Sequence, residues 1–246
     1  MIDMQNRYSR QMLLREIGEK GQERIGNTRC LVVGAGGVGG PAALGLVEAG
    51  VGSLTIIDAD TVDISNLPRQ ILHTPERVGM NKAESARIAL TAVNPSVPVR
   101  AVQSWADDAL LTELASDADI IVDCSDNFRT RHAANRVARA CRRTLITAAS
   151  VRFSLQVSMF DFSNPASPCY ACSFPEDDQQ DVKAAAVGVF SPVTALAGMI
   201  AAGEALKWAA GMPSLVGQML MIDTLTWESS RMRLARDPGC SVCAQH

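Results

Sequence analysis

The sequence predicts a doubly wound α/β fold in which a mostly parallel sheet is continued by antiparallel strands. Strand-like and helix-like segments alternate over residues 30–148, a glycine-rich run follows the first strand, and the alternation stops after residue 148. Parallel neighbours need a crossover connection, usually a helix, whereas antiparallel neighbours do not. We therefore expect one domain built on one mixed sheet.

The chain is expected to begin with an amphipathic helix at residues 8–25. The hydrophobic pattern then switches between strand and helix periods. Strands are predicted at residues 30–33, 54–58, 97–103, 120–123 and 144–148, and helices at residues 41–49, 82–93, 107–115 and 129–141. These helices can serve as crossovers between parallel strands.

The last hundred residues follow a different pattern. The segment FSLQVSMFDF is typical of a strand without a preceding crossover, and QMLMIDTLTWESSRMRLA of one long strand or a hairpin. A helix is predicted between them at residues 192–210. Pro192, Glu204 and Lys207 interrupt its apolar stretch, which is then too short to span a bilayer, so we expect a buried helix.

Composition excludes some classes of protein. The 246 residues are 47% hydrophobic, which is enough for a sizeable core, and carry a net charge of −3. This balance argues against sequence-independent nucleic-acid binding, although a local basic pocket remains possible. The segment MIDMQNRYSRQMLLREIGEKG lacks the uninterrupted apolar core of a signal peptide, so we expect a cytoplasmic protein.

The segment LVVGAGGVGGPAALGL predicts a nucleotide site. Its glycines, Gly34, Gly36, Gly37 and Gly39, follow a β-branched strand and open a helix, where a phosphate can meet backbone N–H groups. Asp58 ends the second strand, where a Rossmann-like fold places its ribose-binding carboxylate. Turns need glycine without any ligand too, and these features do not choose between NAD and ATP.

The polar loop DADTVDISNLPRQILH favours ATP. It carries amide and cationic side chains beside the ribose carboxylate, and Lys82 follows shortly after. Triphosphate chemistry needs such a density of donors, whereas a nicotinamide site does not. The nucleotide-binding candidates of this region are Asp58, Asp60, Ser65, Asn66, Arg69, Gln70 and Lys82.

Several motifs in order carry a resemblance to a known family. The segments RYSRQMLL, GAGGVGG, DADTVDISNLPRQ, VGMNKAESA, DCSDN, CYAC and PGCSVC together resemble the MoeB/ThiF/HesA adenylyltransferases, bacterial relatives of ubiquitin-activating enzymes, most closely the MoeB type. The resemblance implies one adenylation domain over residues 1–246. It also implies a homodimer that uses Mg-ATP to adenylate the C-terminal glycine of a small ubiquitin-like sulfur-carrier protein ending in Gly-Gly.

The resemblance also implies roles for individual residues. Asn66, Arg69 and Lys82 resemble the triphosphate clamp, although solvated polar residues would look the same. Asp126 resembles a magnesium-linked aspartate, and it could at the same time cap the following helix; Asp126 and Asn127 are both expected at the nucleotide site. Arg10 resembles an arginine that reaches the partner subunit's site, or is a helix-surface charge. A glycine carboxylate is already ionised at neutral pH, so no general base is required.

Two C-x₂-C pairs predict a metal site. Cys169 with Cys172 and Cys240 with Cys243 suit a tetrahedral, structural zinc ion without an open position, the alternative being buried or redox-active thiols. The remaining cysteines, Cys30, Cys124 and Cys141, are expected to pack in apolar segments. The histidines His73, His132 and His246 receive no functional role.

A polar segment at about residues 174–188 is expected to be mobile. In thiamine-type members of the family a cysteine there links covalently to the carrier, whereas this chain has Ala184 at the matching position. We expect the reaction to stop at the acyl-adenylate, unless another thiol such as Cys124 serves. No rhodanese-like extension follows the second cysteine pair, so a separate protein is expected to donate sulfur.

Two other functions remain as alternatives. An NAD-dependent oxidoreductase could use the same sheet, and a binding protein could retain the fold without catalysis. The presence of Arg69, Lys82 and Asp126 argues against a binding protein without catalysis. The sequence does not choose between the molybdopterin and thiamine pathways, because carrier identity depends on surface contacts.

Overall fold

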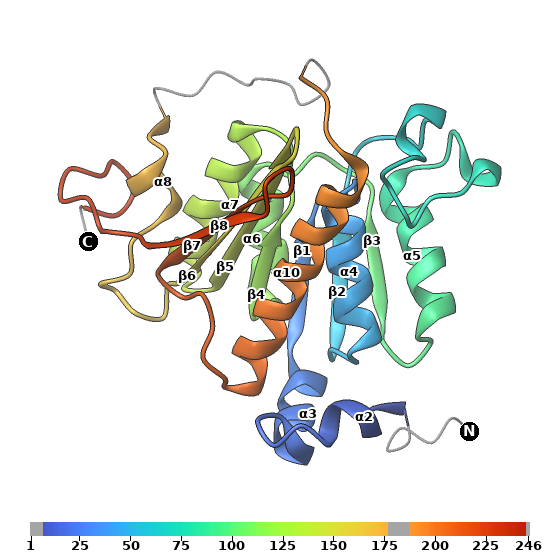
Figure 1. The fold of residues 1–246 in the computed structure, drawn as a ribbon, viewed down its shortest axis with the longest axis horizontal. Helices are drawn as coiled ribbons and strands as arrows, with labels where there is room; N and C mark the ends of the chain where they lie inside the picture. The colour runs from blue at the N-terminus through green and yellow to red at the C-terminus, as the bar shows by residue number, and fades with distance from the viewer. Residues whose placement is uncertain (1–6, 177–186, 245–246) are drawn as a thin grey trace.

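The computed structural model describes residues 7–176 and 187–244, and within these ranges eight strands form one mixed sheet (Figure 1). The strand order is β3-β2-β1-β4-β5-β6-β7-β8. The strands are β1 (Arg29–Val33), β2 (Ser53–Ile57), β3 (Val99–Val102), β4 (Ile120–Asp123), β5 (Thr144–Val151), β6 (Ser154–Asp161), β7 (Gln218–Asp223) and β8 (Glu228–Arg233). The predicted combination of parallel and antiparallel strands is confirmed.

The helices are α2 (Ser9–Met12), α3 (Gly18–Asn27), α4 (Gly39–Glu48), α5 (Lys82–Val93), α6 (Asp108–Ser116), α7 (Phe128–Ala140), α8 (Tyr170–Ser173) and α10 (Ser191–Ala210), with the 3-10 turns η1 (Ile64–Asn66) and η2 (Pro75–Arg77). Strands β1 to β5 pair in parallel, and β5 to β8 pair antiparallel. The segment QMLMIDTLTWESSRMRLA, predicted as one long strand or a hairpin, forms the β7–β8 hairpin.

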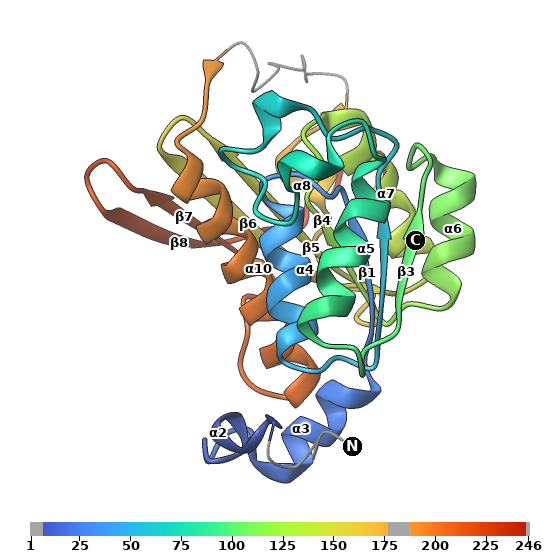
Figure 2. The same cartoon turned by 90° about the vertical axis from the view of Figure 1, so that its right-hand side faces the viewer.

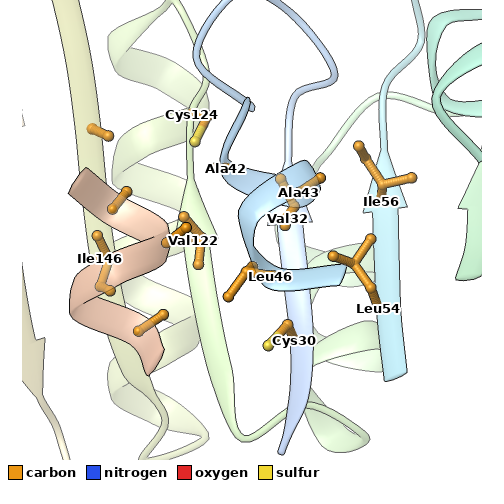
Figure 3. Packing of buried hydrophobic residues seen from close by; sticks show 14 of the residues in the cluster. Cys30, Val32, Ala42, Ala43, Leu46, Leu54, Ile56, Val122, Cys124 and Ile146 are labelled. Carbon is orange, nitrogen blue, oxygen red and sulfur yellow. The ribbon is translucent and has the colours of Figure 1, made fainter. Parts of the chain in front are cut away.

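Helices cover both faces of the sheet (Figure 2). Along β1, Cys30 and Val32 belong to the core beneath α4, α5 and α10, whereas Leu31 and Val33 belong to the core beneath α6 and α7. Figure 3 shows the first core, where Leu46 of α4 lies over β1 and β4. Both faces of the parallel strands are buried, so these strands are continuously apolar instead of alternating.

The predicted first helix at residues 8–25 is wrong, because the chain forms two short helices there. Gly18 starts α3 with a φ of +56°, a conformation that a continuous α-helix does not contain. The N–H groups of Ile17 and Gly18 both donate to the carbonyl of Leu14, closing the turn between α2 and α3. Helical periodicity alone did not reveal this break.

Helix α10 confirms the buried helix predicted at residues 192–210. It packs on α4 and β5, and its lining of small residues includes Ala197, Gly198 and Ala201. Among the residues that the structure describes, no helix combines the length and apolar character needed to cross a membrane.

The sheet topology places the loops that could bind a ligand. Strands β1 and β4 are neighbours in the sheet, but their following connections run to opposite sides: β1 leads to α4 and β4 to α7. In open α/β sheets ligands bind at such a switch point, outside the carboxyl ends of the strands. In Figure 1 this end of the sheet lies opposite α2 and α3.

Candidate nucleotide-binding site

A cavity of about 1740 Å³ lies at the carboxyl ends of the parallel strands and extends to the β7–β8 hairpin. One part contains the loops after β1, β2, β3 and β4. It brings together the predicted residues Gly34, Gly36, Gly37, Asp58, Asp60, Ser65, Arg69, Gln70, Lys82, Asp126 and Asn127. The other part lies along β5 to β8. Small-molecule sites usually have about 300–1,000 Å³, so this cavity has room for more than one small ligand.

The glycine loop between β1 and α4 needs glycine for steric reasons. Gly34 has a φ of +93°, and a Cβ on Gly39 would lie 1.8 Å from the carbonyl oxygen of Gly34. Gly36 and Gly37 face the cavity just before α4 begins. Backbone N–H groups at a helix N-terminus favour an anion. The loop therefore offers a surface that suits a phosphate, and it owes its tight shape to Gly34 and Gly39.

The Asp58 carboxylate is held by the backbone. Its Oδ2 accepts a hydrogen bond from the Ala35 N–H at 2.7 Å, and its Oδ1 accepts one from the Asp60 N–H at 2.8 Å. Burial raises the pKa of Asp58 above its ordinary value, while these two donors and Lys82 act in the opposite direction. Each oxygen retains a second lone pair, so the carboxylate can still accept a ligand hydroxyl.

Two cationic side chains face the cavity from the segment after β2. Lys82 begins α5, and its Nζ lies 2.8 Å from Oδ2 of Asp60. Its side chain is 10% exposed. Arg69 donates to the carbonyl of Ser65 at 3.0 Å. Asn81 caps α5 and also donates to the carbonyls of Asp58 and Asp60, which ties this helix to the end of β2.

The turn after β4 contains a buried polar network. Oδ1 of Asp123 accepts from the N–H and the hydroxyl of Ser125, and Arg131 lies 4.0 Å from Oδ2 and donates to the Ser125 carbonyl. Burial raises the pKa of Asp123, and Arg131 opposes this. Asp126 is exposed at the cavity, whereas Asn127 caps α7. The capping role considered for Asp126 thus belongs to Asn127.

Gln70 is a buried amide that lines the cavity. It is 4% exposed, and its Oε1 accepts no hydrogen bond from the part of the chain that the structure describes. A buried acceptor without a partner is costly. A hydrogen-bond donor on a ligand in the cavity would remove this cost.

Three predicted nucleotide-site residues lie outside the cavity lining. Gly39 is packed beneath the loop, and the Asn66 side chain accepts from the Asp63 N–H in the capping box of η1. Arg10 is exposed on α2, and Figure 1 shows α2 at the opposite end of the sheet. Arg10 does not complete the site within one chain. Ala184 and most of the segment at residues 174–188 lie outside the described residues.

The cavity also contains residues that sequence reasoning missed. Trp105 follows β3, and Arg131 approaches from α7. Asking which residues follow each parallel strand would have found Trp105. A row of polar side chains from β5 to β8 also lines the cavity and carries no recognisable motif: Ser150, Ser154, Gln156, Asp223, Ser229 and Ser230.

The four predicted metal ligands lie together. Their sulfur atoms are within 4.8 Å of one another, with Sγ–Sγ distances of 3.9 Å for Cys169–Cys172, 3.6 Å for Cys169–Cys240 and 3.4 Å for Cys172–Cys243. Four sulfurs placed 2.3 Å from a tetrahedral zinc ion would be about 3.8 Å apart. The cluster therefore fits a zinc ion, and it lies beneath α7 on the opposite face of the sheet from α10.

Among the remaining cysteines and histidines, Cys30, Cys124, His73 and His132 are buried, Cys124 also lines the cavity, and His246 lies outside the described residues. Cys30 and Cys124 are buried, and burial raises the pKa of Cys30 to about 12 and that of Cys124 even further. A thiolate at Cys124 is therefore disfavoured. His73 contacts the Ser85 hydroxyl and the Ala35 carbonyl at 2.9 and 3.0 Å, so it supports the glycine loop. His132 has no hydrogen-bond partner among the described residues, although its Nδ1 lies 3.6 Å from Oε1 of Glu176.

Comparisons with known proteins place the chain among similar sequences and folds. The sequence profile of the ThiF family matches residues 8–242. The chain is 39% identical to the molybdopterin-synthase adenylyltransferase of Escherichia coli K12, over 97% of this chain and 96% of that protein. It is 36% identical to the sulfur carrier protein ThiS adenylyltransferase of the same organism, over 96% of this chain and 94% of that protein. A solved structure of E. coli MccB with MccA-N7isoASN has the same fold, with a TM-score of 0.84, 22% identity and coverage of 98% of this chain and 74% of that one.

Proposed function

Because the chain belongs to the ThiF family, we propose that it is an ATP-dependent adenylyltransferase that activates the C-terminal glycine of a sulfur carrier protein. One observation carries the proposal. A single cavity gathers a glycine loop, a ribose-type carboxylate, two cations and the exposed Asp126 around the switch point of the sheet. An NAD-dependent oxidoreductase would not require Arg69 and Lys82 beside the phosphate-binding loop.

ATP would occupy the part of the cavity at the ends of β1 and β2. Gly36 and Gly37 would contact phosphate oxygens, and Asp58 would accept hydrogen bonds from the ribose hydroxyls. Arg69 and Lys82 would neutralise the triphosphate. Burial keeps the Lys82 ammonium group largely out of water, and its ion pair with Asp60 holds it in place before the nucleotide arrives.

The reaction joins a carboxylate to the α-phosphorus of ATP. A carboxylate oxygen of the carrier glycine forms the new P–O bond, the bond from the α-phosphorus to the bridging oxygen breaks, and pyrophosphate leaves with that electron pair. Both reactants are anions, so the cationic side chains lower the barrier by reducing repulsion and stabilising the leaving group. The carboxylate requires no deprotonation near neutral pH.

The part of the cavity along β5 to β8 would hold the extended C-terminal tail of the carrier. Its lining of serine and glutamine side chains offers hydrogen bonds to a backbone without side chains. A Gly-Gly tail has such a backbone. This part joins the nucleotide part continuously, so a carboxylate entering along it reaches the phosphates.

Two metal ions belong to the proposal. Asp126 would hold Mg²⁺, which supplies charge neutralisation for the departing pyrophosphate. Cys169, Cys172, Cys240 and Cys243 would hold a structural zinc ion, because four protein ligands leave no open position.

The assembly and the partners are part of the same proposal. The position of Arg10, away from the cavity of its own chain, is compatible with a homodimer in which it serves the partner subunit. A separate protein would supply sulfur to the adenylate. No covalent link to the carrier is expected. All seven cysteines are free thiols in the structure, a state that a reducing compartment maintains, and this supports a cytoplasmic reaction.

The test is carrier-dependent exchange of radiolabelled pyrophosphate into ATP. Purified protein is mixed with Mg-ATP and, in separate arms, with a molybdopterin-type or a thiamine-type carrier. Matched controls contain the same carriers without their last glycine. Exchange with one intact carrier and none with its truncated form is the expected result, and the active arm identifies the pathway. Absence of exchange with both carriers would contradict the proposal, as would carrier-independent reduction of NAD.

A further inference from the structure

The order of loops along the sheet edge matches the order of parts in a nucleotide. Strands β1, β2 and β3 are adjacent in the sheet. The glycine loop follows β1, Asp58 follows β2, and Trp105 lies three residues after the end of β3. A nucleotide links phosphate, ribose and base in sequence. With phosphate at β1 and ribose at β2, the base extends toward β3.

Trp105 is placed to receive a flat ring there. It lines the cavity, yet it is 72% exposed. The Asp58 N–H donates to the carbonyl of Val102 at 3.1 Å, which fixes β3 against the end of β2. The Trp105 carbonyl accepts from the Asp107 N–H at 3.1 Å, and Asp107 caps α6. The backbone on both sides is therefore anchored, while the indole remains uncovered.

From this geometry we propose that Trp105 forms one face of the base subsite and stacks on the base of the nucleotide. This inference rests on the proposed function in one respect, since it takes the ligand to be a nucleoside triphosphate. Stacking on an aromatic ring requires a π-face, which every base has, and grows with the area of overlap. Trp105 thus favours purines over pyrimidines. It does not distinguish adenine from guanine, because the ring faces carry no hydrogen-bond pattern.

The experiment measures nucleotide binding by the full chain in the presence of Mg²⁺. Dissociation constants for ATP and UTP are determined by calorimetry for the wild type, Trp105→Ala, Trp105→Phe and Trp227→Phe. Trp227 is the matched control, because it is also 72% exposed but lies in the turn between β7 and β8. Quenching of tryptophan fluorescence by ATP is recorded on the same samples.

Trp105→Ala should weaken ATP binding about tenfold, since stacking contributes about 1–3 kcal/mol per base and 1.4 kcal/mol corresponds to tenfold. UTP binding should weaken less, so the ATP preference shrinks. Trp105→Phe should stay within about threefold of the wild type in affinity. The fluorescence quench should disappear in both Trp105 variants and persist in Trp227→Phe.

Wild-type ATP affinity in Trp105→Ala, or an undiminished quench in Trp105→Phe, would overturn the inference. Pyrophosphate exchange separates this result from the proposed function. Normal exchange by the wild type together with unchanged binding by Trp105→Ala defeats the stacking role alone. No exchange, together with the expected Trp105 effects, defeats the adenylyltransferase proposal alone. Failure of the wild type to bind ATP would contradict both.

Discussion

The carboxylates around the cavity differ in how many hydrogen bonds and ion pairs they form with the rest of the chain. Asp58 accepts two backbone N–H groups and Asp60 pairs with Lys82, whereas Asp126 is exposed and receives a long, 3.4 Å hydrogen bond from Asn127. A carboxylate facing phosphates is favourable when a cation lies between them, and magnesium is commonly held through one or two carboxylates together with substrate phosphates. Asp126 is the best placed of the three for that role.

Asp126→Ala should therefore abolish pyrophosphate exchange and leave the fold intact. The residue is exposed and is not the cap of α7, so no packing or capping is lost. Exchange, circular dichroism and zinc content are measured on the same preparation. Asp117→Ala, at an exposed carboxylate after α6, serves as the control and should retain exchange. Exchange at the wild-type rate in Asp126→Ala would disprove the magnesium role.

A second prediction concerns the buried pair behind this turn. Arg131→Met leaves the buried Asp123 without its cation, and removal of one partner of a buried pair costs about 3–5 kcal/mol. Because the two groups are 4.0 Å apart, the loss should be at the lower end. The free energy of unfolding is measured by urea titration. The double variant Asp123→Asn with Arg131→Met should be more stable than Arg131→Met alone. A further loss in the double variant would show that the pair is not coupled in this way.

At the scale of elements, α10 and α4 approach each other closely beside the glycine loop. A Cβ on Gly198 of α10 would lie 2.2 Å from the carbonyl oxygen of Val38, immediately before α4. The same helix contributes Thr194, which faces the cavity near Gly37. The crossing of these helices therefore fixes the position of the loop that would cradle phosphate.

Gly198→Ala should destabilise the protein by about 1–3 kcal/mol, as overpacking usually does, and weaken ATP binding. Gly203→Ala is the matched control on the same helix, since a Cβ there meets nothing within 4 Å. It should stabilise the protein by about 0.5–1 kcal/mol through helix propensity. Thermal unfolding and calorimetry measure both effects. Equal stability of the two variants would refute the close-crossing argument.

The sequence predicted the elements whose signals are local. The apolar strands, the crossover helices and helix α10 have clear periodicity, and each was found within a few residues of its observed bounds. The break between α2 and α3 was not predicted, because a glycine in a helical pattern does not reveal its φ angle. The sequence also did not decide between one long strand and a hairpin at β7 and β8, because that outcome depends on the pairing of β7 with β6, which is distant in sequence.

The candidate site divides in the same way. The glycine loop, Asp58 and Asp126 follow strand ends, and Lys82 begins a helix. All of them carry recognisable charges or turns, and the structure brings them together. Asn66 looked equally suitable, but its side chain closes a local capping box. Trp105 was missed because an aromatic residue in a loop carries no motif, and its significance depends on the neighbouring strand.

At the scale of the whole molecule, the cysteine cluster connects distant parts of the chain. Cys169 and Cys240 are 71 residues apart in sequence and 3.6 Å apart at their sulfurs. The segment between them contains α10 and the β7–β8 hairpin. A metal ion at the cluster would thus close a long loop, and its binding energy would add to the stability of the fold.

The wild type should contain about one zinc ion per chain. Cys243→Ser should lower both this zinc content and the melting temperature. Treatment of the wild type with a zinc chelator should have the same direction of effect. Cys141→Ser is the control, because Cys141 is half-buried outside the cluster. Zinc is measured by elemental analysis and stability by calorimetry. Native protein free of zinc, or a Cys243→Ser variant as stable as Cys141→Ser, would count against the site.

A metal ion at the cluster would also affect how the edge of the sheet opens. Strand β8 is the outermost strand, all six of its residues are exposed, and the chain continues from it directly to Cys240. A strand tethered at one end can unzip from its free end, one hydrogen bond at a time. With the β7–β8 turn at one end and a metal-bound cluster at the other, β8 would instead detach in its middle, between two fixed points. Amide hydrogen exchange along β8 would then report on the occupancy of a metal site whose four ligands all lie outside the strand.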